Sequence, residues 1–130
     1  PTYKTAGASG IDLMAFIKKP IILAPKSSCL VPTGLSVAFS NEYEIQIRPR
    51  SGLAAKNNIS VLNTPGTVDS DYRGEIKIIL FNHGSCEFVI NNKDRIAQMI
   101  LMPVHKMELE VVENLPITLR GKGGFGSTGK

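Results

Sequence analysis

The sequence predicts an all-β protein: a jelly-roll β-barrel or sandwich with one short helix and a mobile, glycine-rich C-terminal arm. Eight prolines and twelve glycines are spread along the chain, and both residues disfavour long helices. The stretches between them are short and rich in β-branched and aromatic residues, which favour strands. Over residues 43–48 apolar and polar residues alternate, as in a half-buried strand. Many short strands separated by turns are typical of antiparallel barrels.

Eight stretches carry the strand pattern. In chain order they are Pro20–Leu23, Ser28–Pro32, Leu35–Phe39, Tyr43–Ile47, Ile76–Phe81, Glu87–Ile90, Ala97–Val104 and Glu108–Val112. In the fifth stretch, apolar residues recur at every second position, and Ile79 and Phe81 add apolar residues on the other face, which indicates burial on both faces. The segments FSNEYE and FNHGSCEF place Asn, Gly and Ser between apolar runs and predict hairpin turns.

The segment SGLAAKN, Ser51–Asn57, is the one predicted helix. Leu53–Lys56 are helix formers, and Ser51 is a favourable N-cap residue. No repeat or interdomain linker interrupts the chain, so residues 1–119 are expected to form one domain. Residues 120–130, RGKGGFGSTGK, break the β pattern and are expected to form a flexible arm.

Composition narrows the function classes. The chain has 130 residues, of which 42% are hydrophobic and 20% charged, the profile of a globular protein. It contains neither an apolar run long enough for a membrane helix nor a signal-peptide pattern, which predicts a soluble cytoplasmic protein with no membrane partner; an organelle or the nucleus stays open if an N-terminal segment is missing. The net charge of +4 suits a polyanionic ligand, but no aromatic-rich basic motif indicates nucleic acid.

The two cysteines and two histidines suggest neither a metal site nor covalent catalysis. Cys29 and Cys86 follow no metal-binding spacing and are expected to be reduced structural thiols. His83 and His105 stand apart from each other and from any nucleophile motif, so nucleophilic catalysis is not supported.

Polar residues that interrupt the apolar stretches are candidates for binding and catalysis. Arg50 and Ser51 lie at the predicted helix N-terminus, where free N–H groups and a positive side chain suit an anion; the alternative is a simple cap and a solvated charge. In NTPGTVDSDYRGE, Asp69 follows an apolar residue and is a candidate general base, the alternative being a polar hairpin loop. Gln98 lies inside an apolar run and needs a hydrogen-bond partner, either in the structure or in a ligand.

Five segments, in order, resemble the five motifs of the trimeric dUTPases. They are AGASGIDLMA, RPRSGLAAKN, NTPGTVDSDYRGE, RIAQMIL and RGKGGFGSTG, and together they span residues 6 to 129. The resemblance implies a jelly-roll fold and a homotrimer whose active sites are shared between subunits. It implies hydrolysis of dUTP to dUMP and pyrophosphate, which keeps uracil out of DNA and supplies dUMP.

The resemblance also implies a role for each motif residue. Asp69 would activate the water that attacks the α-phosphorus, and Tyr72 would pack under the deoxyribose and leave no room for a 2′-hydroxyl. Uracil would be bound by Asn63, the backbone of Gly66, Thr67 and Val68, Lys77, and Phe125 stacking from the arm. The phosphates would be held by Arg50, Ser51, Gly52, Gln98, Arg120, Gly126, Ser127 and Thr128.

The expected cofactor is Mg²⁺, held mainly by the triphosphate and water. No direct protein ligand is expected, and Asp12 would reach the metal through water, which agrees with magnesium's tendency to keep its waters. The arm, residues 120–130, is expected to be a lid, disordered without nucleotide and ordered with it. Thr64, Pro65 and Thr67 depart from the residues most expected in the third motif, where the implied contacts are largely made by the backbone.

Two other functions compete with this interpretation. A dCTP deaminase shares the implied fold, but such enzymes lack the DYRG arrangement and an arm of this sequence. A non-catalytic nucleotide-binding or capsid-like jelly roll is disfavoured by the intact Asp69, Tyr72 and fifth motif.

Overall fold

The computed structural model describes residues 1–126. Its elements are β1 (Ile11–Met14), β2 (Ile21–Leu23), β3 (Ser28–Pro32), β4 (Tyr43–Arg48), α1 (Ser51–Asn57), β5 (Ile59–Val61), β6 (Gly66–Val68), β7 (Lys77–Asn82), β8 (Phe88–Ile90) and β9 (Arg95–Pro103). The protein is thus mostly β, as predicted, and α1 is the only helix within residues 1–126. No helix among these residues is long and apolar enough to cross a membrane.

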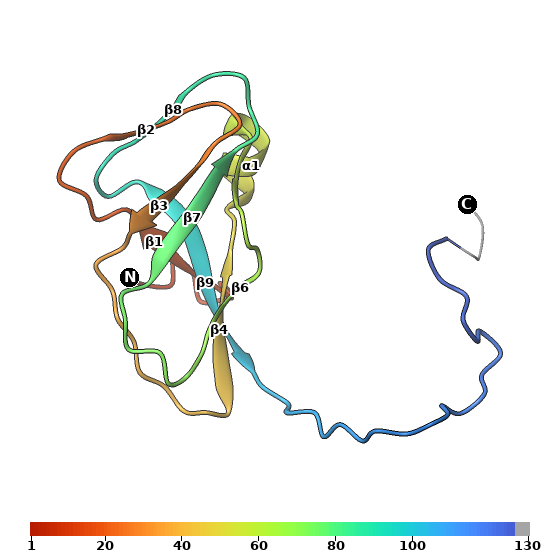
Figure 1. The fold of residues 1–130 in the computed structure, drawn as a ribbon. Helices are drawn as coiled ribbons and strands as arrows, with labels where there is room; N and C mark the ends of the chain where they lie inside the picture. The colour runs from red at the N-terminus through yellow and green to blue at the C-terminus, as the bar shows by residue number, and fades with distance from the viewer. Residues whose placement is uncertain (127–130) are drawn as a thin grey trace.

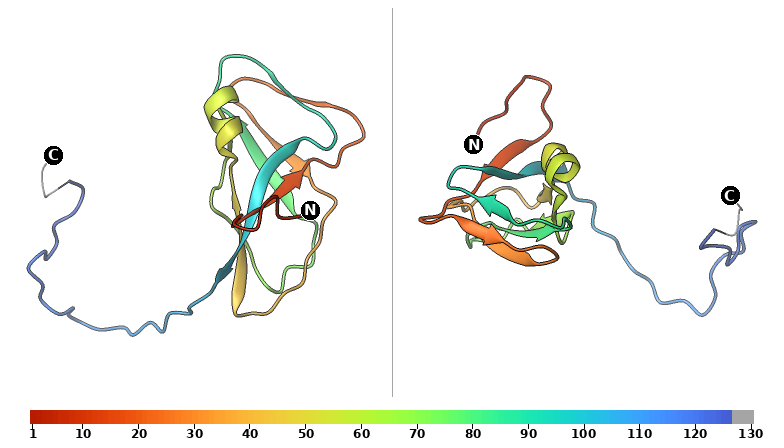
Figure 2. Two further views of the ribbon diagram at one scale, coloured as in Figure 1. Left: turned by 180° about the vertical axis from the view of Figure 1, so that it is seen from behind. Right: turned by 90° about the horizontal axis from the view of Figure 1, so that it is seen from above.

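The strands form three antiparallel groups around one interior. A four-stranded sheet has the order β1-β9-β4-β6, a three-stranded sheet the order β3-β7-β5, and β2 pairs with β8. Figures 1 and 2 show α1 at one end of the barrel and the departure of the C-terminal segment at the opposite end.

The core lies between the sheets and follows the period-2 pattern. Along β7, Ile78, Leu80 and Asn82 are buried while the residues between them are half-buried, so Ile79 and Phe81 are covered only in part. Leu13, Val31 and Leu80 are fully buried. Burial of each such side chain contributes about 1.5–3 kcal/mol.

Three strands had no counterpart in the sequence prediction: β1, β5 and β6. Each is only three or four residues long, too short for a period to be seen. Their pairing partners, β9, β7 and β4, lie far away in sequence, so their strand character is set by tertiary contacts.

Two predicted strands are wrong. Residues 35–39 alternate between half-buried and exposed but join no ladder, although the Leu35 carbonyl accepts a hydrogen bond from Ile76 N–H at 2.8 Å. Residues 108–112 are exposed and also join no ladder. A strand pattern specifies which face is apolar, but only a neighbouring backbone makes a ladder.

The predicted helix is confirmed, but its cap is not Ser51. Arg50 is the N-cap, with extended backbone angles (φ −91°, ψ 127°) and no capping side chain, and its carbonyl accepts from Ala54 N–H at 3.0 Å. The helix begins at Ser51 itself. A guanidinium has no acceptor for the free N–H groups of the helix, and the Arg50 side chain instead forms an ion pair with Asp12.

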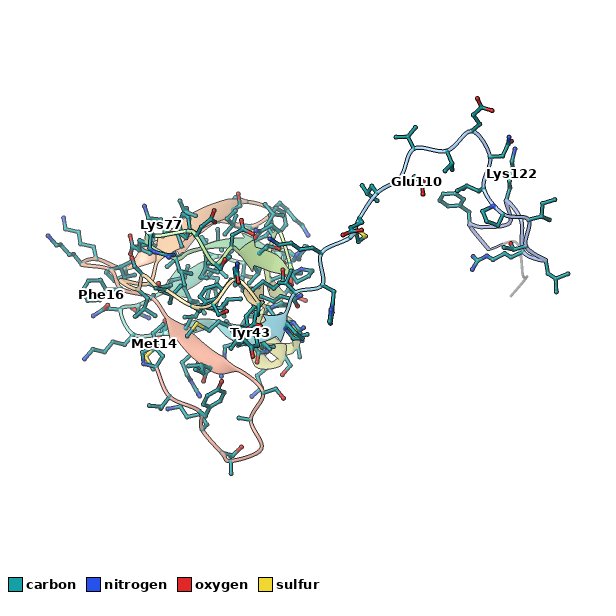
Figure 3. All side chains as sticks on the ribbon, turned by 90° about the horizontal axis from the view of Figure 1, so that it is seen from below. Met14, Phe16, Tyr43, Lys77, Glu110 and Lys122 are labelled. Atoms are coloured by element: carbon teal, nitrogen blue, oxygen red, sulfur yellow. The ribbon has the colours of Figure 1, made fainter. Side chains whose placement is uncertain are left out.

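The chain leaves the barrel soon after β9. Val104 N–H still donates to the Glu42 carbonyl at 2.8 Å, and beyond it residues 105–126, the C-terminal segment, extend away from the sheets (Figure 1). Figure 3 shows Glu110 and Lys122 far from Tyr43 and Lys77, which lie on the barrel. The chain therefore leaves the barrel at about residue 105, well before Arg120, where the arm was expected to begin.

Both cysteines are free thiols, as expected. Cys29 is half-buried on β3, and burial raises the pKa of its thiol. Cys86 is exposed.

Candidate active site

A cavity of about 400 Å³ lies between β6, the loop that follows it, and β7. Its lining includes seven of the predicted substrate-binding and catalytic residues: Asn63, Gly66, Thr67, Val68, Asp69, Tyr72 and Lys77. Apolar residues of the neighbouring strands, among them Leu30, Ile47 and Ile79, complete the walls. A concave site in which apolar walls meet convergent polar groups is the usual form of a small-molecule site.

The polar edge of this cavity depends on β6. This strand is at the edge of its sheet and pairs only with β4, with Ile47 opposite Gly66. An edge strand turns half of its N–H and C=O groups away from its neighbour, so Gly66–Val68 can offer backbone groups to a ligand. A Cβ at Gly66 would lie 3.2 Å from Asn63 Nδ2 and 3.4 Å from Ile47 Cβ, so glycine lets the Asn63 amide pack closely here.

Tyr72 is held in the loop between β6 and β7 by three local features. Its N–H donates to the Asp69 carbonyl at 3.2 Å, and its hydroxyl donates to the Glu75 carbonyl at 2.9 Å. The ring lies over Gly74, where a Cβ would be only 2.4 Å from the Tyr72 hydroxyl oxygen. The 44% exposed ring is therefore fixed from behind while one side faces the cavity.

The carboxylate of Asp69 lies at the end of β6 and is exposed at the cavity wall. Elsewhere in the lining, the Lys77 ammonium lies 3.9 Å from the Glu75 carboxylate. Glu75 also accepts a hydrogen bond from Gly34 N–H at 2.8 Å, which ties this wall to the loop after β3. Sequence reasoning did not single out Gly74 or Glu75, although both directly follow the Asp69–Arg73 run.

A second polar group, the Asp12 cluster, gathers residues from three other motifs: Asp12, Arg50, Arg95 and Gln98. Asp12 on β1 accepts from Arg50 Nε at 2.9 Å and from Arg95 NH1 at 3.1 Å. Gln98 on β9 pairs across the sheet with Asp12 and with Arg48, and its amide donates to the Pro49 carbonyl at 3.0 Å. Of the two alternatives for Gln98, a structural partner is therefore present.

Ser51 and Gly52 are exposed in the first turn of α1, next to this polar cluster in sequence. A Cβ at Gly52 would meet nothing within 4 Å, so the space in front of this turn is open. Arg95 was not among the predicted site residues. Its place three residues before Gln98, in the same motif, was the available signal.

The C-terminal segment holds the remaining predicted residues. Arg120 Nε donates to the Gly123 carbonyl at 2.9 Å, and Phe125 is fully exposed with a left-handed backbone (φ 50°). Gly126 is also left-handed (φ 87°). Ser127 and Thr128 lie outside the described residues.

The predicted site residues therefore form three groups in one chain. The cavity lining includes none of Arg50, Gln98 or Arg120, and the C-terminal segment extends away from the barrel (Figures 1 and 2).

Comparison with known proteins decides the family. The family model for dUTPase matches residues 1–129. The chain is 54% identical to the deoxyuridine 5′-triphosphate nucleotidohydrolase of Treponema denticola, over 99% of this chain and 90% of that protein. It is 52% identical to the enzyme of the same name from Bdellovibrio bacteriovorus, over 100% of this chain and 87% of that protein.

The chain belongs to the dUTPase family. It is accordingly a dUTP diphosphatase, a nucleotide hydrolase.

Solved dUTPase structures share the fold. A mutant of the dUTPase from Staphylococcus bacteriophage 80alpha, solved with dUpNHpp, superposes with a TM-score of 0.88 at 22% identity and covers 100% of this chain and 91% of that one. A mutant of the dUTPase from phage phi11 of S. aureus, described with a structural Mg(II) ion, has a TM-score of 0.79 at 20% identity, over 88% of this chain and 90% of that one. These likenesses support the predicted jelly-roll architecture.

Proposed function

We propose that this dUTPase hydrolyses dUTP to dUMP and pyrophosphate by attack of an Asp69-activated water on the α-phosphorus. The carrying observation is that Asp69 shares one cavity with Asn63, the β6 edge and Tyr72. A carboxylate at the rim of a cavity that holds a base and a sugar is positioned to aim and deprotonate a water at the first phosphate.

Base selection rests on the β6 edge. The backbone of Gly66–Val68 and the Asn63 amide offer both donors and acceptors to a pyrimidine edge. Cytosine reverses the donor and acceptor pattern of uracil, and each buried polar group left unpaired costs about 1–3 kcal/mol. Thymine is excluded sterically, because the tight Asn63–Tyr72 loop leaves no room for a 5-methyl group. Tyr72 packs under the deoxyribose and excludes a 2′-hydroxyl.

The Asp12 cluster binds the phosphates. Arg50 uses Nε and NH1 within the chain, two of the five N–H donors of a guanidinium, so three remain for phosphate oxygens. Ser51, Gly52 and Gln98 complete this subsite. Arg120, Gly126, Ser127 and Thr128 close on the outer phosphates from the C-terminal arm, and Phe125 stacks on uracil, which contributes about 1–3 kcal/mol.

Mg²⁺ fits this chain as a substrate-held ion. In the part of the chain that the structure describes, no three His, Cys, Asp or Glu side chains gather as a metal site. Both Asp12 oxygens already accept from arginines, but a carboxylate has about four acceptor positions, so Asp12 can still accept from a metal-bound water. When bound, Mg²⁺ would neutralise phosphate charge.

We further propose that the active site is completed between copies of the chain, in a homotrimer. The separation of the cavity, the Asp12 cluster and the C-terminal segment within one chain supports this. So does the segment itself, in which apolar residues recur at every second position over 107–111 and again over 115–119 and are almost fully exposed: Met107, Leu109, Val111, Leu115, Ile117 and Leu119. Such a face needs a partner surface to cover it.

Pyrophosphate release from dUTP, dCTP and dTTP tests the proposal, with Asp69→Asn as the variant. Loss of a general base lowers the rate by about 10²–10⁴-fold, while binding of a non-hydrolysable dUTP analogue should be nearly unchanged. Asp71→Asn is the matched control, because Asp71 is exposed in the same loop but does not line the cavity. Wild-type turnover by Asp69→Asn would show that Asp69 is not the base.

The same assay separates the competing functions. Release of ammonia from dCTP would indicate a deaminase, and nucleotide binding without any turnover would indicate a binding module.

A further inference from the structure

The pairing of β1 with β9 contains a bulge that redirects one arginine. Asp12 lies opposite Gln98 and Leu13 opposite Ala97, but Met14 lies opposite Arg95, one residue beyond its regular partner Ile96. In an unbroken ladder Arg95 would lie on the same face as Ala97, which is fully buried. The extra residue puts both Ile96 and Ala97 in the core and turns Arg95 outward. Bulges next to active sites often re-aim a side chain in this way.

The redirected Arg95 makes two contacts within the Asp12 cluster, one with Asp12 and one with Arg50. Its NH1 group donates to Asp12 Oδ2 at 3.1 Å, while Arg50 Nε donates to Oδ1 of the same carboxylate at 2.9 Å. The backbone carbonyl of Arg95 also accepts from Arg50 NH1 at 3.2 Å. Arg50 is therefore fixed by a frame that consists of Asp12 and the bulged residue itself.

Charge gives Arg95 a second effect. If Asp12 were paired with Arg50 alone, the pair would be neutral and Arg50 a weaker anion ligand. With Arg95 sharing the carboxylate, two positive charges surround one negative charge, so the cluster keeps a net positive charge. Both arginines line one cleft of about 350 Å³. Asp94 lines this cleft too; its carboxylate remains negative, but it accepts from Asn91 N–H at 2.7 Å in the preceding turn, whereas both arginines are paired with Asp12.

We propose that Arg95 is a positioning residue for the triphosphate: placed by the β9 bulge, it shares Asp12 with Arg50, fixes the direction of the Arg50 guanidinium and keeps the subsite positive. This inference rests on the proposed role of Arg50 in binding phosphate. It predicts that loss of Arg95 lowers the affinity for a nucleoside triphosphate more than the affinity for a monophosphate.

The test compares the affinities of a non-hydrolysable dUTP analogue and of dUMP by titration calorimetry for wild type, Arg95→Gln, Arg95→Lys and Arg48→Gln. Arg48→Gln is the control. It also removes one positive charge, but the Arg48 guanidinium donates hydrogen bonds to Gln46 on its own strand. Arg95→Gln should lower the affinity for the analogue by about tenfold, the size of a lost charge-assisted hydrogen bond. The affinity for dUMP should stay within about twofold of wild type. Arg95→Lys keeps the charge and should recover part of the loss. Arg48→Gln should bind both ligands like wild type.

Each other outcome overturns the inference. If Arg95→Gln lowers the affinities for both ligands equally and also lowers the melting temperature, Arg95 has only a structural role. An unchanged analogue affinity, or an equal loss in Arg48→Gln, would exclude positioning through Asp12. If Arg95→Gln does not fold, wild-type affinities in Arg95→Lys would refute a requirement for the guanidinium. Wild-type protein that binds neither ligand would instead refute the proposed function on which the inference rests.

Discussion

Gly74→Ala adds a single methyl group and is expected to displace the Tyr72 ring, which lines the cavity. The new Cβ would lie 2.4 Å from the Tyr72 hydroxyl oxygen, 2.6 Å from Cζ and 2.9 Å from Cε2. Ordinary contact begins near 3.4 Å, so the ring has to move by about 1 Å, because overlap at these distances is strongly repulsive.

The displacement has a cost in stability and a larger cost in activity. It removes the hydrogen bond from Tyr72 to the Glu75 carbonyl, a net loss of about 0.5–1.5 kcal/mol. The half-exposed ring can swing toward solvent, so the remaining overpacking cost stays near the lower end of about 1–3 kcal/mol. A group misplaced by about 1 Å can lower catalysis about 10²-fold, so kcat/KM for dUTP should fall by about ten- to a hundredfold.

Specificity provides the sharper assay. If the ring excludes a 2′-hydroxyl, its displacement should narrow the ratio of kcat/KM for dUTP over UTP, measured by pyrophosphate release. Gly7→Ala is the control, since a Cβ at Gly7 meets nothing within 4 Å, and should behave as wild type. A Gly74→Ala enzyme with wild-type rates and an unchanged dUTP/UTP ratio would refute both the steric argument and the role of Tyr72.

Two further predictions concern the C-terminal segment. A chain ending at Arg120 should melt like wild type, because the core residues all lie before it, yet its kcat should fall severely; full activity would remove the lid role. Sedimentation of the intact protein should give three times the mass of one chain, and Leu115→Asp, on the uncovered apolar face, should shift it toward monomer while Asn114→Asp does not. A monomeric wild-type protein would count against shared active sites.

The sequence predicted the strands that carry their own signal. Ser28–Pro32 and most of β4 and β7 alternate over five or more residues, and that period fixes which of their residues face the core. The sequence did not predict β6, because its three residues include a glycine. This segment is a strand only because β4 lies beside it. The opposite error occurred at residues 35–39, where the pattern is present but the ladder is missing.

The candidate site shows the same division. Residue chemistry in ordered motifs was enough to nominate Asp69, Tyr72 and Arg50, because such patterns are local in the sequence. The residues around them could not be predicted in this way. Gly74 matters only because the Tyr72 ring lies over it, and Arg95 matters only because a bulge turns it toward Asp12.

By itself, then, the sequence determined a β-rich barrel, one short helix and the family to which the chain belongs, since periodicity, turn residues and motif order are properties of neighbours along the chain. The tertiary structure decided which strands pair, where the helix begins, and that Asp12, Arg50, Arg95 and Gln98 gather while Asn63, Asp69 and Tyr72 line a separate cavity. The physical reason is that hydrogen-bond ladders, steric fit and ion pairs depend on distances in space between residues remote in sequence.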